Sequence, residues 1–339
     1  MQRCFQLAQN GLGKVAPNPM VGCVIVKDGR IIGEGFHIEH GGPHAEVNAI
    51  ESVKDTSALK GATLYVNLEP CVHYGKTPPC SNRIIESGIS KVVISGSDPN
   101  NVVMNKGIKM LEENDVVVQT GLLLDAELNL NRRFRVFHSE KRAYVILKWA
   151  QTKDGFMDKK RERGEGGQFK ISGPQAKRLV HQWRSEEQAI LVGSGTIIND
   201  DPLLTVREID GKRPLRIVID LKNEIPSNAK IFTDGKDTLV YNSSKSSKID
   251  AVEYKRIESS DNSVPEILSD LHERGIQSLF VEGGAFTLQS FLDTTWDEAR
   301  VFVSQDNIHS GLKAPHIDSE PEIKQGVGQD ELYIYRSIK

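Results

Sequence analysis

The sequence is poor in cysteine, with only 4 cysteines in 339 residues. This number is too small for the disulfide framework that stabilises small secreted domains, and it favours a reducing compartment. The chain also lacks an apolar stretch of signal-peptide or membrane-spanning length. We therefore expect a cytoplasmic protein that does not enter a membrane.

An excess of charge of one sign is also lacking. The 43 Lys and Arg residues and the 46 Asp and Glu residues are interspersed, and the net charge is −3. A nucleic-acid surface or a polybasic membrane patch would require clustered positive charge. No internal repeat or low-complexity tract is present either. The charge pattern therefore gives no indication of a nucleic-acid or membrane partner, and we expect neither.

The most informative pattern consists of metal-ligand residue types with a carboxylate among them. His44 and Glu46 lie two positions apart, and Cys71 and Cys80 follow. Zinc nucleobase deaminases carry His-x-Glu, then Pro-Cys and a second Cys, and their Glu carries protons without binding the metal. Three protein ligands leave the fourth zinc position for water, as in catalytic sites, and zinc lowers the pKa of that water to about 7. The pattern predicts His44, Cys71 and Cys80 as zinc ligands and Glu46 as the catalytic proton carrier.

The spacing of the two cysteines differs from the common Cys-x-x-Cys form. Eight residues separate Cys71 from Cys80, and two prolines directly precede Cys80. Prolines are tolerated at the start of a helix, so the insertion can loop out while a helix begins near Cys80. An alternative is a non-enzymatic module closed by zinc, for which His73 is the nearest fourth ligand. Cys4 and Cys23 are expected to be small buried residues.

Strand and helix patterns alternate through the first half of the chain. A hairpin with the turn Asp28-Gly29 is predicted for strands at 21–26 and 30–36. Helices from 45 and 81 and at 104–113, strands at 63–68, 91–95 and 115–120, and one helix at 122–137 are predicted to follow. This order indicates an α/β layered sheet.

A second α/β region is expected beyond a boundary near residue 140. Its predicted elements are strands at 143–150, 189–192, 215–220, 238–241 and 278–282 and a helix at 174–184, with a solvated loop at 242–248. Glycine turns follow two of the strands, at 193–195 and 283–284. A strand, a glycine turn and a helix N-terminus place backbone N–H groups at a phosphate. Each turn alone could be an ordinary connection, but the pair favours a dinucleotide site.

Longer sequence runs resemble the bifunctional riboflavin-biosynthesis deaminase/reductase family over nearly the whole chain. In the first half they are 17–22, 44–46, 68–71, 75–80 and 97–100, and in the second half 153–155, 183–185, 190–196, 199–207 and 281–284. The long spacing between Cys71 and Cys80 is this family's own form. The alternative of a zinc nucleobase deaminase fused to an unrelated redox domain is disfavoured, because the resemblance continues through Arg207.

The resemblance implies a fold, two reactions and two cofactors. Residues 1–140 would form a zinc-dependent, cytidine-deaminase-like three-layer domain. They would hydrolytically deaminate 2,5-diamino-6-ribosylamino-4(3H)-pyrimidinone 5′-phosphate. Residues 141–339 would form a dihydrofolate-reductase-like α/β domain, which would use NADPH to reduce the ribosyl group to ribityl and give 5-amino-6-(5-phosphoribitylamino)uracil. The cofactors would be Zn²⁺ and NADPH, the partner a phosphorylated pyrimidine, and we expect a homo-oligomer.

The resemblance also assigns binding residues, position by position. The deaminase substrate contacts would be Asn18, His37, Lys76, Asp98 and Asn100. The reductase substrate contacts would be Gln168, Arg184, Leu204, Arg207 and Glu282. Lys148 is predicted as a further reductase substrate contact from the sequence itself, because a lysine in the middle of an apolar strand is costly to bury. The NADPH contacts would be Gln151, Lys170, Thr196, Asp200 and the turn Gly284, Ala285, Phe286, Thr287, Leu288, Gln289 and Ser290.

Three positions depart from the family's usual residues. Gln168 stands where a small residue is common, Lys170 stands where a Trp is common, and Leu221 stands where a Ser is usual after Asp220. A lysine near phosphates could serve a phosphorylated ligand, whereas a leucine removes one hydroxyl from the expected cofactor edge. Trp149 and Trp183 are expected to pack in the core rather than to stack on a cofactor.

Overall fold

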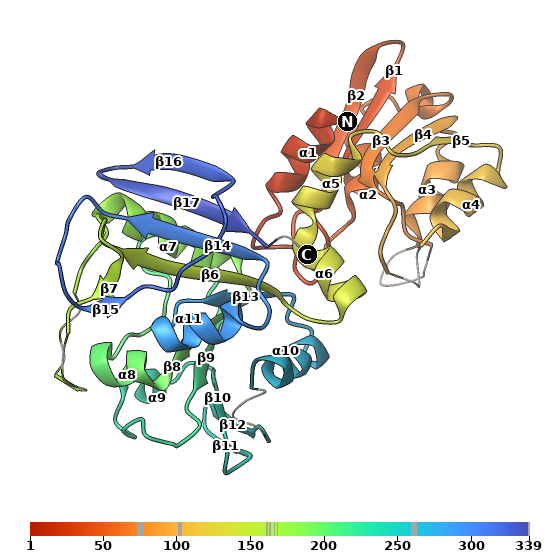
Figure 1. Cartoon of the computed structure of the whole chain (residues 1–339). Coiled ribbons are helices and arrows are strands. Elements are labelled where there is room, and N and C mark those ends of the chain that lie inside the picture. Colours follow the sequence, from red (N-terminus) through yellow and green to blue (C-terminus); the bar gives the residue numbers. More distant parts are fainter. Residues whose placement is uncertain are drawn as a thin grey trace. The chain divides into compact units, whose positions relative to one another are not determined.

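Figure 1 shows the computed structural model of the chain, which describes residues 1–72, 78–100, 104–160, 162, 164–165, 167, 169–258 and 263–337. The chain divides into two compact units, Met1–Lys141 and Arg142–Lys339. The expected ligands Lys76 and Gln168, and the alternative metal ligand His73, lie outside the described residues. Among the helices of these ranges, none combines the length and the apolarity that a bilayer crossing requires.

The first unit is built on a five-stranded sheet in the order β2-β1-β3-β4-β5. The strands are β1 Gly22–Lys27, β2 Arg30–Phe36, β3 Thr63–Leu68, β4 Lys91–Gly96 and β5 Val117–Gln119. β1 pairs antiparallel with β2 and with β3, whereas β3, β4 and β5 run parallel. The predicted opening hairpin is confirmed.

Helices cover both faces of this sheet (Figure 1). They are α1 Gln2–Gln9, α2 Ala45–Glu51, the 3₁₀ helix η1 Thr56–Leu59, α3 Cys80–Glu86, α4 Lys106–Glu112, α5 Leu124–Leu130 and α6 Arg132–Glu140. Strand side chains alternate between the two faces. Ile25 and Leu64 therefore pack with the Ala49 of α2 and Ile84 of α3, whereas Val24 packs with α1. The result is the expected three-layer arrangement.

The single helix predicted at 122–137 is wrong. The segment forms two helices, α5 and α6, which break at Asn131, where φ is −98° and ψ is 23°. The Asn131 side chain accepts the Met20 N–H at 2.8 Å and donates to the Met20 carbonyl at 3.1 Å, and the residue is buried. An asparagine that satisfies a distant backbone in this way competes with helix continuation, and periodicity alone does not reveal such a contact.

The second unit is built on a ten-stranded sheet in the order β11-β12-β10-β9-β8-β13-β6-β14-β17-β16, beside a small sheet of β15 and β7. The strands are β6 Tyr144–Gln151, β7 Phe156–Asp158, β8 Ala189–Gly193, β9 Leu215–Ile219, β10 Thr238–Asn242, β11 Ser247–Ile249, β12 Val252–Arg256, β13 Ser278–Val281, β14 Glu298–Val303, β15 Leu312–Lys313, β16 Ile323–Val327 and β17 Asp330–Arg336. Neighbouring pairs from β12 to β14 are parallel, and the pairs at both edges are antiparallel. The predicted α/β class is confirmed.

The helices of the second unit connect the parallel strands. They are α7 Pro174–Glu186, α8 Ser194–Asp200, α9 Lys230–Thr233, α10 Ser263–Glu273 and α11 Ala285–Leu292. The predicted loop at 242–248 is wrong in part, because β11 begins at Ser247 and Asn242 is buried at the end of β10. The neighbours β8 and β13 lead directly into α8 and α11. Parallel strands end at the same edge of a sheet, so the two glycine turns lie side by side.

Candidate active sites

A group of three metal-ligand side chains lies in the first unit. His44 directly precedes α2, Cys71 follows β3, and Cys80 is the first residue of α3. The His44 Nδ1 atom is 3.6 Å from the Cys71 Sγ and 3.3 Å from the Cys80 Sγ. All three ligand atoms lie within 4.8 Å of one another, and no other such group of His, Cys, Asp or Glu residues was found among the described residues.

This donor set fits zinc. One imidazole nitrogen and two thiols are zinc's preferred ligand types, and a fourth tetrahedral position remains. Hydrogen bonding from the Cys80 thiol, helped by the His44 ring, lowers the pKa of the Cys71 thiol, which favours the thiolate that a metal requires. The Cys80 backbone N–H, at the start of α3, points at the Cys71 Sγ at 3.4 Å. The group is therefore suited to holding a metal cation.

Glu46 lies beside the ligand group without belonging to it. It occupies the first turn of α2 and is only 3 % exposed. Burial raises the pKa of its carboxyl to about 7. A carboxyl with such a pKa exchanges its proton near neutral pH, which is the property of an acid–base group.

Asn18 and His37 lie together next to His44. The His37 Nδ1 faces the Pro43 carbonyl at 2.9 Å, and the His37 Nε2 faces the Asn18 side-chain nitrogen at 2.9 Å. A carbonyl only accepts, so Nδ1 donates and Nε2 accepts from Asn18. Burial lowers the pKa of His37, which favours the neutral ring that this pair of hydrogen bonds requires. The His37 and His44 rings make an edge contact with centroids 5.5 Å apart, so the structure brings these expected substrate contacts to the metal-ligand group.

Asp98 and Asn100 lie on the segment that follows β4. The Asn100 N–H donates to the Asp98 carboxylate at 2.8 Å, and burial raises the pKa of Asp98 to about 6. The buried Glu69 accepts the Asp98 N–H at 3.3 Å. Glu69 lies in the sequence run 68–71, but no function was predicted for it from the sequence. Its place between a predicted strand and a predicted metal ligand was the feature that could have indicated one.

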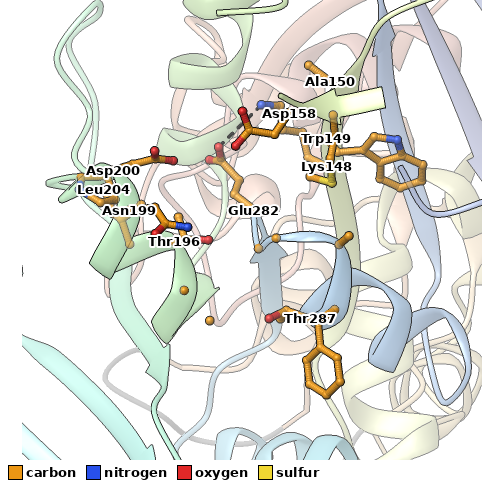
Figure 2. A pocket seen from close by; sticks show the side chains of 18 of the residues that line it. Lys148, Trp149, Ala150, Asp158, Thr196, Asn199, Asp200, Leu204, Glu282 and Thr287 are labelled. Atoms are coloured by element: carbon orange, nitrogen blue, oxygen red, sulfur yellow. Dashed lines mark ion pairs between the residues drawn. The ribbon is translucent and has the colours of Figure 1, made fainter. Parts of the chain in front are cut away.

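The second unit contains a cavity of about 1330 Å³ at the carboxyl ends of β6, β8 and β13 (Figure 2). Most residues predicted for the reductase line it. They are Lys148, Lys170, Arg184, Thr196, Asp200, Leu204, Arg207, Glu282, Gly284, Ala285, Phe286, Thr287 and Ser290. The volume exceeds that of a typical drug-sized pocket, so the cavity can accommodate two ligands side by side.

A buried charged group forms one wall of this cavity. Glu282, just after β13, accepts two hydrogen bonds from the Arg184 guanidinium, at 2.6 and 3.0 Å. The Lys148 Nζ atom lies 3.7 Å from Oε2 of this carboxylate, the oxygen that also accepts from the Arg184 Nη2. Burial opposes ionisation of Glu282, but Arg184 and Lys148 outweigh it and lower the pKa of the carboxyl. Burial lowers the pKa of Lys148. Arg184 therefore connects α7 to the end of β13.

The two glycine turns meet at Thr287. A Cβ atom on Gly193 would lie 2.4 Å from the Thr287 Oγ1, and one on Gly283 would lie 2.6 Å from the Thr287 Cβ. Only glycine permits this approach at either turn. Because both α8 and α11 begin here, the N–H groups of their first turns, which have no acceptor within their own helix, flank the cavity.

Three expected NADPH contacts do not line the cavity. Leu288 is completely buried, because it shares with Phe291 the face of α11 that packs into the core, whereas Thr287 and Ser290 line the cavity. The Gln289 side chain donates to Asp293 at the helix surface, and the Gln151 side chain accepts from Trp149. An α-helix has 3.6 residues per turn, so the consecutive residues 284–290 cannot all face one ligand.

Some cavity residues were missed by the sequence reasoning. They include Asp158, Lys177, His181, Asn199 and Lys222. Figure 2 shows Asp158 and Asn199 among the side chains around the cavity. His181 lies one helical turn before Arg184 on α7, and that spacing was the available signal. Trp183 stacks on Phe302 with centroids 5.5 Å apart, which confirms it as a core residue.

Comparisons with known proteins agree with the division of the chain into two units, each with its own site. Residues 1–96 match the cytidine and deoxycytidylate deaminase zinc-binding region, and residues 143–304 match the RibD C-terminal domain. The riboflavin biosynthesis protein RibD of Bacillus amyloliquefaciens is 40 % identical over 94 % of this chain and 87 % of its own length. The protein of the same name from Aquifex aeolicus is 38 % identical over 92 % of this chain and 88 % of its own length.

Solved structures give the same result. One similar crystal structure is that of a diaminohydroxyphosphoribosylaminopyrimidine deaminase/5-amino-6-(5-phosphoribosylamino)uracil reductase from Thermotoga maritima. Its sequence is 37 % identical to this chain, the match covers 100 % of this chain and 97 % of that one, and the TM-score is 0.89. The Acinetobacter baumannii RibD structure is 31 % identical, covers 100 % of this chain and 98 % of its own, and has a TM-score of 0.88.

The fold and sites define a zinc-dependent deaminase unit joined to an NADPH-dependent reductase unit. The chain belongs to the RibD family of bifunctional riboflavin-biosynthesis deaminase/reductases. Because residues 143–304 match the family's own C-terminal domain, the alternative of an unrelated redox domain is wrong. The cofactors that the family implies, Zn²⁺ and NADPH, agree with those expected from the sequence.

Proposed function

We propose that the chain acts on a phosphorylated pyrimidine in two successive steps. The unit Met1–Lys141 hydrolytically deaminates 2,5-diamino-6-ribosylamino-4(3H)-pyrimidinone 5′-phosphate. The unit Arg142–Lys339 then reduces the ribosyl group of the product to ribityl. The observation that carries the proposal is the pairing of a three-ligand metal group with a separate cavity that contains a buried cationic wall.

In the deaminase unit, His44, Cys71 and Cys80 hold the zinc. When bound, zinc acts as a Lewis acid that makes hydroxide available at neutral pH. The Glu46 carboxyl moves protons between the attacking oxygen, the ring nitrogen and the leaving ammonia. Because burial raises its pKa to about 7, the carboxyl can both take up and release a proton near neutral pH. Glu46 is not one of the three residues of the ligand group, so its carboxyl serves proton transfer and not metal binding.

The binding residues of this unit orient the pyrimidine. The Asn18 amide fixes the His37 ring through the hydrogen bond between them, and the His37 ring lies against His44. The Asp98 carboxylate accepts hydrogen bonds from the polar edge of the pyrimidine, and the Asn100 side-chain amide both donates to this edge and accepts from it. Lys76 holds the 5′-phosphate, an assignment that rests on its place between the two cysteines in the sequence.

In the reductase unit, the helix N-termini after the glycine turns hold the cofactor phosphates, with Thr196 and Asp200 beside them. NADPH supplies the hydride. Arg184, Glu282 and Lys148 bind and orient the ribosyl hydroxyls, and Arg207 adds positive charge for the substrate phosphate. Lys170 serves the same charge balance at the cofactor, whereas Leu221 offers only an apolar contact.

The experiment follows the two steps separately. The protein, loaded with zinc, receives the diamino substrate with and without NADPH, and ammonia release and NADPH absorbance are recorded. Ammonia without NADPH, followed by NADPH oxidation when it is added, supports the proposal. NADPH oxidation on the diamino substrate with no ammonia release would contradict the order of steps.

Location and assembly form part of the same proposal. The free cysteines and the lack of a membrane-spanning helix among the described residues support a cytoplasmic protein. The homo-oligomer expected from the family resemblance is tested by sedimentation velocity, in which a monomer mass at working concentration would contradict it.

A further inference from the structure

The Glu69 side chain accepts hydrogen bonds from four backbone N–H groups. It stands between the end of β3 and Pro70, two residues before the ligand Cys71, and it is only 4 % exposed. Its Oε1 accepts from the N–H groups of Gly107 and Ile108, at 2.9 and 3.4 Å. Its Oε2 accepts from the N–H groups of Asn105 and Asp98, at 3.0 and 3.3 Å. A buried carboxylate is tolerated only with such compensation.

These hydrogen bonds join two segments that approach the metal-ligand group from different strands. The Glu69 backbone also donates to the Gly96 carbonyl at 3.0 Å, at the end of β4. Glu69 therefore fixes the segment Asp98–Asn100, and separately Asn105 at the start of α4, relative to the strand end that leads to Cys71.

Glu69 also replaces a missing helix cap. Asn105 precedes α4 with a left-handed φ of 59° and makes no side-chain cap. The free N–H groups of the first helical turn, those of Gly107 and Ile108, bond to Glu69 instead. A Cβ on Gly107 would lie 2.1 Å from the Pro70 carbonyl, so the helix start can approach only because this residue is glycine.

We propose that Glu69 is a positioning residue for deamination. It sets the place of Asp98 and Asn100 relative to the zinc ligands, and it touches neither metal nor substrate. The inference rests on the proposed function, because it assigns Asp98 and Asn100 to the pyrimidine. A shift of about 1 Å in a positioning element can reduce turnover by about 10²-fold.

The test uses Glu69→Gln in the full, zinc-loaded chain. The amide keeps the volume, but its NH₂ group would face two backbone N–H groups in place of an acceptor. We expect kcat/KM for ammonia release to fall by about 10²-fold, with zinc content and the reductase rate on the deaminated pyrimidine unchanged. Gly107→Ala displaces the helix start while Glu69 stays intact, and it should reproduce the loss.

A matched control separates positioning from simple loss of stability. Leu59→Ala removes a buried side chain from the same core without touching the segment. At a temperature where each variant is fully folded, Leu59→Ala should keep the wild-type kcat/KM. If Glu69→Gln deaminates within about twofold of wild type, or loses zinc in proportion to activity, the inference is overturned. Wild-type protein that releases no ammonia would instead overturn the proposed function.

Discussion

Arg184 and Glu282 form a two-point ion pair that joins α7 to the end of β13. The guanidinium Nε and Nη2 atoms donate to the two carboxylate oxygens at 2.6 and 3.0 Å, and both side chains are largely buried. The remaining guanidinium nitrogen donates to the Thr205 carbonyl at 3.2 Å. Arg184 therefore holds a fixed orientation, and the carboxylate of Glu282 is shared with Lys148 rather than committed to one cation.

We predict that Glu282→Gln lowers the stability of the reductase unit and its activity together. The variant leaves Arg184 and Lys148 buried without their anion, and breaking a buried pair costs about 3–5 kcal/mol. Denaturant unfolding and NADPH oxidation measure the two effects, and deaminase activity should be retained.

The control for this prediction is an exposed ion pair in the same unit. The Glu322 carboxylate, just before β16, lies 2.6 Å from the guanidinium of Arg336 at the end of β17, and both side chains are about a third or more exposed to solvent. Glu322→Gln should change stability by less than about 1 kcal/mol. If Glu282→Gln and Glu322→Gln lower the free energy of unfolding equally, the buried ion pairs of Glu282 contribute no more to stability than an exposed pair.

We predict that Glu46→Gln keeps zinc but loses deaminase activity by about 10²- to 10⁴-fold, because general acid–base help is worth that amount. Metal analysis and an ammonia assay on the same sample measure the two properties. Glu51→Gln, at the exposed end of α2, serves as the control and should leave both unchanged. A zinc-loaded Glu46→Gln protein with normal ammonia release would show that another group carries the protons.

The sequence allowed the metal-ligand group to be predicted because residue type and order carry that information. His44, Cys71 and Cys80 come from three different elements, yet each lies at an end of a helix or strand whose pattern is readable. The break at Asn131 was not readable, because its cause is a hydrogen bond to Met20, which is distant in the sequence. Long-range contacts of this kind override local periodicity.

The residues of the reductase cavity could likewise be predicted only in part from local sequence patterns. Lys148 was found because a lysine in an apolar strand is a conflict that local reasoning detects. Leu288 and Gln289 were assigned through a continuous run, but the orientation of α11 directs them away from the cavity. Asp158 comes from the short strand β7, whose pairing with β15 depends on residues more than 150 positions away.

We predict that Lys76→Ala raises the deaminase KM more for the phosphorylated substrate than for its dephosphorylated analogue. A lysine that holds a phosphate loses a charge-assisted contact only when the phosphate is present. Lys54→Ala, an exposed lysine of the same unit, is the control. The same KM increase for both substrates would mean that Lys76 does not contact the phosphate.

The last prediction concerns removal of the metal. The zinc-ligand group lies in the unit Met1–Lys141, and the glycine turns and cavity lie in Arg142–Lys339. Chelation should therefore stop ammonia release while the reductase still oxidises NADPH on the already deaminated pyrimidine, because its hydride comes from the nicotinamide. Zinc can also stabilise the fold of the first unit, so circular dichroism is recorded on the same samples, and re-addition of zinc should restore ammonia release. If chelation abolishes NADPH oxidation while the second unit stays folded, the two activities are not divided between the units as proposed.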